Sequence, residues 1–326
     1  MRHRWSIGPR TSLCRGTSGP EPPTTSRGDA AAGEGMKRAT DLVARLQVRQ
    51  PNDRSLGQHF LIEEAHLEAI VGLAGDLKGR VVLEIGPGPG TLTEHLLRAG
   101  AVVHAIEIDA VAVEHLREAF AEAIESRTLV LHEGDALTTP WPDHIDAVVS
   151  NIPYQISSPL IDVLEQHRRR HAAPEVVVLL VQEEFAERLT LATPADRGSL
   201  GICTALGWSS TMDRRVPPGS FRPPPAVMSR VCVLRPIDLP GDVDHRLVRQ
   251  TVHAAFHHRR RKLRTSLQRP PRRLSRLPGW HAARWKHAMA SLGQDAVMDL
   301  RPEDLTVEEW CGFCHRLASV EVQSPS

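Results

Sequence analysis

The chain of 326 residues is 41% hydrophobic, 24% charged and 4% aromatic, with a formal net charge of +1. These values are typical of a soluble globular protein with one full domain and a second, smaller one. No run of about 18 apolar residues occurs, so we expect no transmembrane helix.

The first 50 residues are rich in Arg, Ser, Thr, Pro, Gly and Ala and show no hydrophobic period, which predicts a disordered extension. Residues 1–28 carry several arginines and a single acid, Glu21, a composition compatible with an organellar transit peptide. The protein would then lie in an organellar matrix. The alternative, which we favour, is that translation begins at Met36.

Strand-like and helix-like segments alternate after this extension. Strand-like runs cover 81–86, 102–109, 128–136, 146–151, 175–182 and 228–235, and amphipathic segments cover 91–99, 110–124 and 157–170. Alternation of this kind predicts a doubly wound α/β domain, with a mostly parallel sheet covered by helices on both faces, over residues 51–238. The proline-rich segment 216–227 predicts an ordered loop or hairpin connection.

Only helical patterns follow Pro240, so residues 239–326 are predicted to form a small all-helical domain. Between His245 and Gln294 this domain has no acid and thirteen Lys or Arg residues, which indicates a polyanionic partner such as RNA. The densest run, the expected RNA contact, consists of Arg259, Arg260, Arg261, Lys262 and Arg264.

Four successive predicted strands end in glycine or polar residues. Gly86 and Gly88 form a tight turn at the end of the first strand, and Glu107 lies near the end of the second. Asp135 and Asn151 lie at the ends of the third and fourth strands. These positions meet at one edge of a parallel sheet, where a carboxylate can accept hydrogen bonds from ribose hydroxyls or an adenine amine. The glycine spacing is G-x-G-x-G, whereas dinucleotide-binding enzymes have G-x-G-x-x-G.

The only tyrosine of the chain, Tyr154, follows Asn151-Ile152-Pro153. The exocyclic amine of adenine is a poor nucleophile because its lone pair is delocalised into the ring. The side-chain oxygen of Asn151 and the carbonyl of Ile152 can accept its two hydrogens. Pro153 fixes the turn, and Tyr154 offers a flat face to the base. The tetrapeptide matches the motif of amino-methyltransferases that act on adenine; the alternative is a structural turn.

From Arg54 to the C-terminus the chain resembles the ribosomal RNA small-subunit adenine dimethyltransferase family. The matching motifs are "GQHFL", "LEIGPGPGTLT", "IEID", "GDAL", "NIPYQISSPL", "VPPGSFRPPPAVMSRV", "FHHRRRKLRTSL" and "RPEDLTVEEWCGFC". The resemblance implies a Rossmann-like class I methyltransferase fold with a seven-stranded sheet and a helical C-terminal domain.

The resemblance also implies a function and a site. S-adenosylmethionine would contact His59, Leu61, Gly86, Gly88, Glu107, Asp135 and Asn151. Phe221 would stack on a flipped adenine opposite Tyr154. The expected product is N6,N6-dimethylation of two adjacent adenines near the 3′ end of small-subunit rRNA. We expect a monomer that acts on an immature ribosomal subunit during its biogenesis.

Two segments depart from the family pattern. Relatives commonly have Q-K-E-V where this chain has "QEEF" at 182–185, and Y-G-R-L-S where it has "RGSLG" at 197–201. These departures put RNA contacts of the catalytic domain in doubt, but not the cofactor residues. Two alternatives stay open: a large-subunit rRNA adenine methyltransferase that confers antibiotic resistance, and a non-catalytic protein with a role in ribosome assembly or transcription.

The five cysteines are too few for a disulfide framework and indicate a reducing compartment, in agreement with a cytoplasmic protein. The segment "CGFCH" at 311–315 has the spacing of a c-type haem attachment site. It lies inside an amphipathic helical pattern, so we interpret Cys311 and Cys314 as partly buried helix residues and expect no metal.

Overall fold

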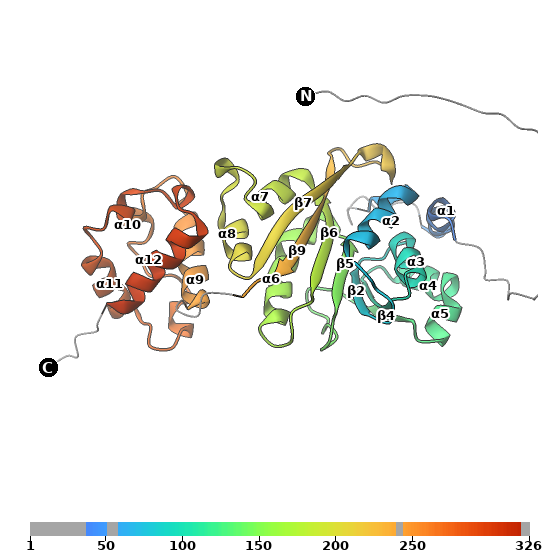
Figure 1. The fold of residues 1–326 in the computed structure, drawn as a ribbon, viewed down its shortest axis with the longest axis horizontal. Helices are drawn as coiled ribbons and strands as arrows, with labels where there is room; N and C mark the ends of the chain where they lie inside the picture. Colours follow the sequence, from blue (N-terminus) through green and yellow to red (C-terminus); the bar gives the residue numbers. More distant parts are fainter. Residues whose placement is uncertain (1–36, 51–57, 239–243, 321–326) are drawn as a thin grey trace, which may run out of the picture. The chain divides into compact units, whose positions relative to one another are not determined.

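The computed structural model describes residues 37–50, 58–238 and 244–320, and the chain from Lys37 onward forms one compact unit. Its centre is a seven-stranded sheet of order β4-β3-β2-β5-β6-β9-β7, most of whose strands are labelled in Figure 1. Strands β1 and β8 form a separate two-stranded sheet. The strands are β1 (Phe60–Leu61), β2 (Val81–Ile85), β3 (Val102–Glu107), β4 (Leu129–Glu133), β5 (Ala147–Asn151), β6 (Val176–Gln182), β7 (Trp208–Val216), β8 (Phe221–Arg222) and β9 (Ser229–Pro236).

The strand order reverses beside β2. Strands β4, β3, β2, β5 and β6 are parallel, whereas β9 is antiparallel to both β6 and β7. The chain extends the sheet from β2 through β3 to β4, then returns to the other side of β2 with β5 and β6. Open sheets of this kind bind ligands at the carboxyl ends of the strands beside such a reversal. The predicted doubly wound, mostly parallel sheet is confirmed.

Helices cover both faces of the sheet. The helices are α1 (Ala39–Arg49), α2 (Glu64–Leu73), α3 (Thr91–Arg98), α4 (Ala110–Ala119), α5 (Ala121–Glu125), α6 (Ser157–Arg168), α7 (Glu183–Thr190), α8 (Ser199–Ala205), α9 (His245–Phe256), α10 (Leu263–Ser266), α11 (Ala282–Ser291) and α12 (Val307–Ser319). In β6, Val176 and Val178 join a core with α2 and α3, whereas Val177 and Leu179 join a second core with α6 and α7. Burial on both faces explains the unbroken apolar sequence of this strand.

The strand β7 was not predicted from the sequence. It lies at the edge of the sheet, and only its two end residues, Trp208 and Val216, are buried. A solvated edge strand carries polar residues on both faces, so it lacks an apolar run. The proline-rich segment forms the expected connection between β7 and β9. Within it, β8 pairs with β1 through Phe60–Arg222 and Leu61–Phe221.

The prediction that the first 50 residues are disordered is wrong for α1. Leu42, Val43 and Leu46 are buried on one face of this helix, and Val43 and Leu46 pack with Phe60 and Ala112. Three apolar positions among charged residues give a weak sequence signal, and tertiary packing supplies the stability of the helix. Residues 1–36 and 51–57 lie outside the described residues.

Residues 244–320 contain α9 to α12, and no strand occurs in this described range, as the sequence predicted. Their core includes Trp285, Trp310 and Phe313. It also includes Ile202 and Cys203 of α8, so the helical part shares its core with the sheet-containing part. The predicted boundary at residue 239 lies outside the described residues.

The segment "CGFCH" lies in α12, where Cys314 is buried and Cys311 is half-buried, as interpreted from the sequence. Within the described ranges, no helix is long and apolar enough to cross a membrane.

Candidate active site

Residues at the carboxyl ends of four strands line one cavity of about 210 Å³. Gly86 follows β2, Glu107 ends β3, Asp135 follows β4 and Asn151 ends β5. The cavity therefore lies beside the reversal between β2 and β5. The sequence prediction that these four positions meet is confirmed.

The turn after β2 needs its glycines because the backbone has positive φ and packs closely on other elements. Gly88 has φ +54°, and a Cβ there would lie 2.8 Å from the ring of Phe60. Gly86 has φ +65°, and a Cβ there would lie 3.3 Å from Pro153. These two glycines bring the turn against β1 on one side and the Asn-Ile-Pro-Tyr turn on the other.

The carboxylate of Glu107 is fixed by backbone N–H groups and is 6% exposed. One oxygen accepts from Gly88 N, and the other accepts from Ile108 N and Asp109 N, all at 2.9 Å. Burial raises the pKa of this carboxyl, and the three N–H groups oppose the rise. A carboxylate accepts about four hydrogen bonds, so Glu107 has room for about one more donor.

Several lining residues were not singled out from the sequence. Ile108 is 60% exposed, and with Ile85, Ile106 and Ala136 it gives the cavity an apolar surface. In the sequence, Ile108 lies between two acids in "IEID", and nothing in that pattern marks it as a cavity residue. Other lining residues missed by the prediction are Gln58, Phe60, Gly134, Gln155 and Ile156.

Asn151 is held in one orientation by the segment that precedes β1. Its Nδ2 donates to the backbone carbonyl of His59 at 3.0 Å. Because the amide nitrogen is the donor, the other end of the side chain is the acceptor Oδ1. The backbone N–H of Ile152 donates to Leu180 O at 3.2 Å, which attaches the turn to β6. Asp135 caps its own turn by accepting from Leu137 N at 2.9 Å.

Tyr154 begins a short 3₁₀ turn, Tyr154–Ile156, on the rim of the cavity. Its hydroxyl hydrogen-bonds to Ser229 Oγ at 2.7 Å, and burial raises its pKa. The ring stacks on that of His59, with 5.5 Å between centroids and an interplanar angle of 30°. His59 Nδ1 lies 3.0 Å from the carbonyl of Pro223. His59 thus connects the tyrosine to the proline-rich connection.

Two predicted site residues lie elsewhere in this structure. Leu61 is 1% exposed and Phe221 is 3% exposed, and both belong to a hydrophobic core rather than to the cavity lining. Their burial follows from the pairing of β1 with β8. The ring that faces Tyr154 is that of His59. Stacking of Phe221 on a base and contact of Leu61 with the cofactor stay predictions.

The predicted RNA-binding run is exposed, but three of its members are paired with acids. Arg259 contacts Glu303, and Lys262 and Arg264 share Asp299. These acids follow the acid-free segment in the sequence, so counting charges in that segment alone overstated its free positive charge. Among the described residues no acidic partner is seen for the exposed Arg260 and Arg261.

Comparison with known proteins identifies the family. The family described as "Ribosomal RNA adenine dimethylase" matches residues 49–276. The ribosomal RNA small subunit methyltransferase A of Erythrobacter litoralis is 34% identical over 282 residues, which cover 84% of this chain and 93% of that protein. The chain belongs to the ribosomal RNA adenine dimethylase family. It is accordingly an S-adenosylmethionine-dependent rRNA adenine dimethyltransferase, as the sequence predicted.

Solved structures agree. A dimethyladenosine transferase from Plasmodium falciparum has a TM-score of 0.64 and 27% identity, and the match covers 77% of this chain and 94% of that chain. The 23S rRNA methyltransferase ErmE has a TM-score of 0.54 and 27% identity, with 80% of this chain and 100% of that chain covered. Both support the predicted class I methyltransferase fold.

The cavity of this dimethylase fits its methyl donor, S-adenosylmethionine. A fixed carboxylate at Glu107 suits a ribose, and the apolar surface around Ile108 suits the face of an adenine ring. Because Gly86 and Gly88 have no Cβ, a ligand can approach the backbone of this turn closely.

A buried glutamate lies under the same turn. Glu84 of β2 is 1% exposed and accepts a hydrogen bond from Thr93 Oγ1 at 2.7 Å. Burial raises the pKa of its carboxyl from 4.5 to about 8, so the group is mostly protonated at neutral pH. No signal in the sequence distinguished this glutamate from a surface acid.

The raised pKa of Glu84 predicts a pH-dependent stability. Its contribution is fully present below its unfolded-state pKa of 4.5 and is lost as pH rises through about 8. A tenfold change in proton affinity between the folded and unfolded chain corresponds to about 1.4 kcal/mol. Between pH 5 and 9 the free energy of unfolding of the wild type should fall. That of Glu84→Gln, whose side chain stays neutral, should fall less, by a few kcal/mol. Thermal unfolding across this range measures it; a difference that does not vary with pH contradicts the prediction.

Proposed function

We propose that this dimethylase methylates N6 of two adjacent adenines near the 3′ end of small-subunit rRNA, in an immature ribosomal subunit. The observation that carries the proposal is the orientation of Asn151, whose amide donates to His59 O and thereby offers Oδ1 as an acceptor inside the cavity. The curated relative from Erythrobacter litoralis, named for the small subunit, supports the choice of substrate. We further propose that the protein is a monomer that acts in the cytoplasm.

The strand-end residues hold the cofactor. Glu107 would accept a hydrogen bond from a ribose hydroxyl on its remaining acceptor site, Ile108 would pack on the adenine ring, and Asp135 would accept from the adenine amine. His59, Gly86 and Gly88 line the rest of the site. S-adenosylmethionine supplies an electrophilic methyl group bound to a sulfonium.

The Asn-Ile-Pro-Tyr turn activates the substrate base. The Oδ1 atom of Asn151 and the carbonyl oxygen of Ile152 accept hydrogen bonds from the two N–H groups of the N6 amine. These hydrogen bonds localise the lone pair on nitrogen. Tyr154 presents its ring to the base while its hydroxyl is anchored on Ser229. Holding nitrogen and methyl group in line contributes about 7–11 kcal/mol to lowering the barrier.

The role of Glu107 predicts a loss of cofactor affinity in its variants. Glu107→Ala should weaken binding of S-adenosylmethionine by about 10- to 150-fold, because a hydrogen bond to a charged group contributes about 1.5–3 kcal/mol. Glu107→Gln keeps one acceptor oxygen for the backbone N–H groups and should weaken binding less than Glu107→Ala. Calorimetry measures both, and thermal unfolding shows whether each variant is folded. Wild-type affinity in both variants would remove Glu107 from the site.

The two alternatives from the sequence are less well supported. A non-catalytic protein has no need for an oriented Asn151 and an intact cavity. The large-subunit enzyme ErmE is structurally similar, but with a lower TM-score than the dimethyladenosine transferase, 0.54 against 0.64.

We propose that the helices after residue 244 form the RNA-binding part. Arg260 and Arg261 are exposed and lie where α9 connects to α10, beside the paired cations Arg259, Lys262 and Arg264. Free guanidinium groups gain more from a phosphate than groups that must first leave a carboxylate.

This difference predicts unequal effects on salt dependence. Each phosphate contact contributes about 0.7–0.9 to the slope of log affinity against log salt. We expect Arg260→Gln/Arg261→Gln to flatten the slope for rRNA by about 1 to 2, and Arg259→Gln/Lys262→Gln, with the same charge change, to flatten it less. Filter binding at several salt concentrations measures the slopes. If Arg260→Gln/Arg261→Gln had the same slope as the wild type, these arginines would be solvated surface residues that do not contact RNA.

A direct test uses particles. Small-subunit particles that lack the modification, incubated with the protein and S-adenosylmethionine, should yield N6,N6-dimethyladenosine by mass spectrometry of the digested rRNA. Large-subunit particles should yield none. The reverse pattern would support the large-subunit alternative, and no product from either particle would contradict the proposal.

A further inference from the structure

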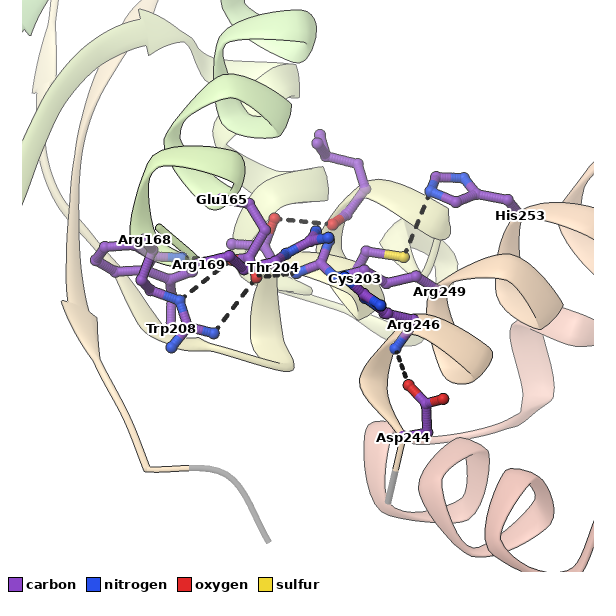
Figure 2. Close-up of polar contacts among 11 residues, drawn as sticks. Glu165, Arg168, Arg169, Cys203, Thr204, Trp208, Asp244, Arg246, Arg249 and His253 are labelled. Carbon is purple, nitrogen blue, oxygen red and sulfur yellow. Dashed lines mark hydrogen bonds and ion pairs between the residues drawn. The ribbon is translucent and has the colours of Figure 1, made fainter. Parts of the chain in front are cut away.

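Four arginines surround a depression of about 330 Å³ where the end of α6 meets the start of α9. We call it the arginine junction; its lining residues are Glu165, Arg168, Arg169, Asp244, His245, Arg246 and Arg249. Figure 2 shows Glu165 among the guanidinium groups, and Asp244 beside Arg246 on the facing helix. Helix α6 begins at Ser157, next to the catalytic turn, and extends about 18 Å at 1.5 Å per residue. The arginine junction is therefore separate from the methylation cavity.

One carboxylate lies at the centre of the arginine junction. Glu165, with a side chain 5% exposed, contacts Arg168 at 3.3 Å, Arg169 at 3.5 Å and Arg249 at 3.1 Å. It also accepts from Trp208 Nε1 at 3.1 Å. Burial acts to raise the pKa of Glu165, but the neighbouring arginines Arg249 and Arg168 hold it below its ordinary value. Glu165 is thus ionised and its acceptor sites are filled.

The inner arginines are fixed before any ligand binds. Arg168 lies over the ring of Trp208, 5.8 Å from its centroid, and a Cβ at Gly207 would lie 2.3 Å from its guanidinium. The side chain of Arg249 is only 11% exposed. Because both side chains are already immobilised by packing, binding an anion costs them little further conformational entropy.

Positive charge exceeds negative charge in this partly buried place. Four guanidinium groups face two carboxylates, and Asp244 already caps α9 by accepting from Arg246 N and Leu247 N. The Nε2 atom of His245, which also lines the depression, is buried and has no hydrogen-bond partner among the described residues. An anion stabilises the net positive charge of this half-buried site, and it can accept from His245 Nε2 in the tautomer that carries its proton there.

We propose that the arginine junction binds a phosphate group between α6 and α9. A guanidinium offers several parallel N–H donors that match phosphate oxygens, and Arg169 and Arg246 are exposed enough to turn toward it. The phosphate comes either from the backbone of the RNA substrate or from free inorganic phosphate. In both cases it links the catalytic sheet to the helices that follow residue 244, and so sets their relative position.

The first test uses inorganic phosphate and the full chain. Phosphate replaces chloride at constant ionic strength, and thermal unfolding is followed. We expect a saturable rise of Tm for the wild type, as for any ligand that binds only the folded state. Arg169→Gln/Arg246→Gln should lose the rise, since it removes the two exposed arginines but keeps Arg168 and Arg249 on Glu165. Arg170→Gln is the matched control, because Arg170 is exposed, adjacent and outside the depression.

The second test separates the sources of the phosphate. The salt slope for rRNA should fall by about 1 to 2 in the double variant if both arginines contact the backbone, and should not change in Arg170→Gln. A lost Tm rise with an unchanged slope assigns the site to free phosphate. The proposal is overturned if phosphate does not stabilise the wild type, or if Arg170→Gln loses as much as the double variant. The RNA measurement rests on the proposed function, but the phosphate measurement needs no RNA, so the two can fail separately.

Discussion

Replacing Asn151 with alanine is expected to lower the rate of methyl transfer by about 100-fold or more, with a much smaller change in the affinity for S-adenosylmethionine. The amide of Asn151 donates to His59 O at 3.0 Å, which leaves Oδ1 to accept from the substrate amine. Alanine removes that acceptor, and an oriented polar contact made in the transition state is commonly worth about 10²–10³ in rate.

Single-turnover kinetics with saturating cofactor and small-subunit particles measures this effect. The matched variant is Asn151→Asp, which keeps an acceptor oxygen but loses the Nδ2 donor to His59 O. It should retain more activity than Asn151→Ala, whose loss should lie in kcat rather than in the KM for the cofactor. A near-wild-type rate for Asn151→Ala would leave activation of the amine to the Ile152 carbonyl alone.

The strands that form the site were predictable because of their burial. In β6, residues on both faces enter hydrophobic cores, so the sequence is an unbroken run of Val and Leu. The edge strand β7 is also long, but only its end residues Trp208 and Val216 are buried. Its sequence is therefore mostly polar and resembles that of a loop. A strand is recognised in a sequence by the apolar residues that it buries, and an edge strand with few buried residues lacks that signal.

The cavity was predictable where its residues lie at strand ends, since topology alone brings Gly86, Glu107 and Asn151 together. Contacts between distant segments were not predictable. The pairing of β1 with β8 buries Leu61 and Phe221, and the stacking of His59 on Tyr154 depends on that pairing. No local pattern encodes which short segment pairs with which.

The positive charge of the C-terminal helices was predictable from the sequence, but how many of these cations are free to bind RNA was not. The acids that neutralise part of the basic run, Asp299 and Glu303, lie 35 to 44 residues away in the sequence. Conversely, the arginine junction combines ordinary charged residues of α6 and α9 whose proximity only the fold determines. A count within one segment cannot show either effect.

We expect the enzyme to methylate a partly assembled small subunit and to act weakly or not at all on a short naked hairpin with the same two adenines. The target base must leave its stack, which costs a few kcal/mol that binding elsewhere has to offset. Where relatives commonly have a lysine, this chain has Glu183, and Glu183 contacts Arg215. Arg197 is engaged with the carbonyls of Glu303 and Asp304. Neither of these two segments therefore offers a free cation to RNA.

Exposed cations for which no acidic partner is seen among the described residues occur on the later helices, where Arg260 and Arg261 lie in the segment between α9 and α10. A short hairpin that enters the cavity has no second RNA segment to reach them, whereas folded rRNA in a particle does. We expect kcat/KM to be at least about 100-fold higher on the particle, which corresponds to about 2.7 kcal/mol of binding energy from the distant contacts. Arg260→Gln/Arg261→Gln should reduce activity on the particle and leave activity on the hairpin unchanged. Equal kcat/KM on both substrates, measured in the same salt, would mean that local sequence determines the target.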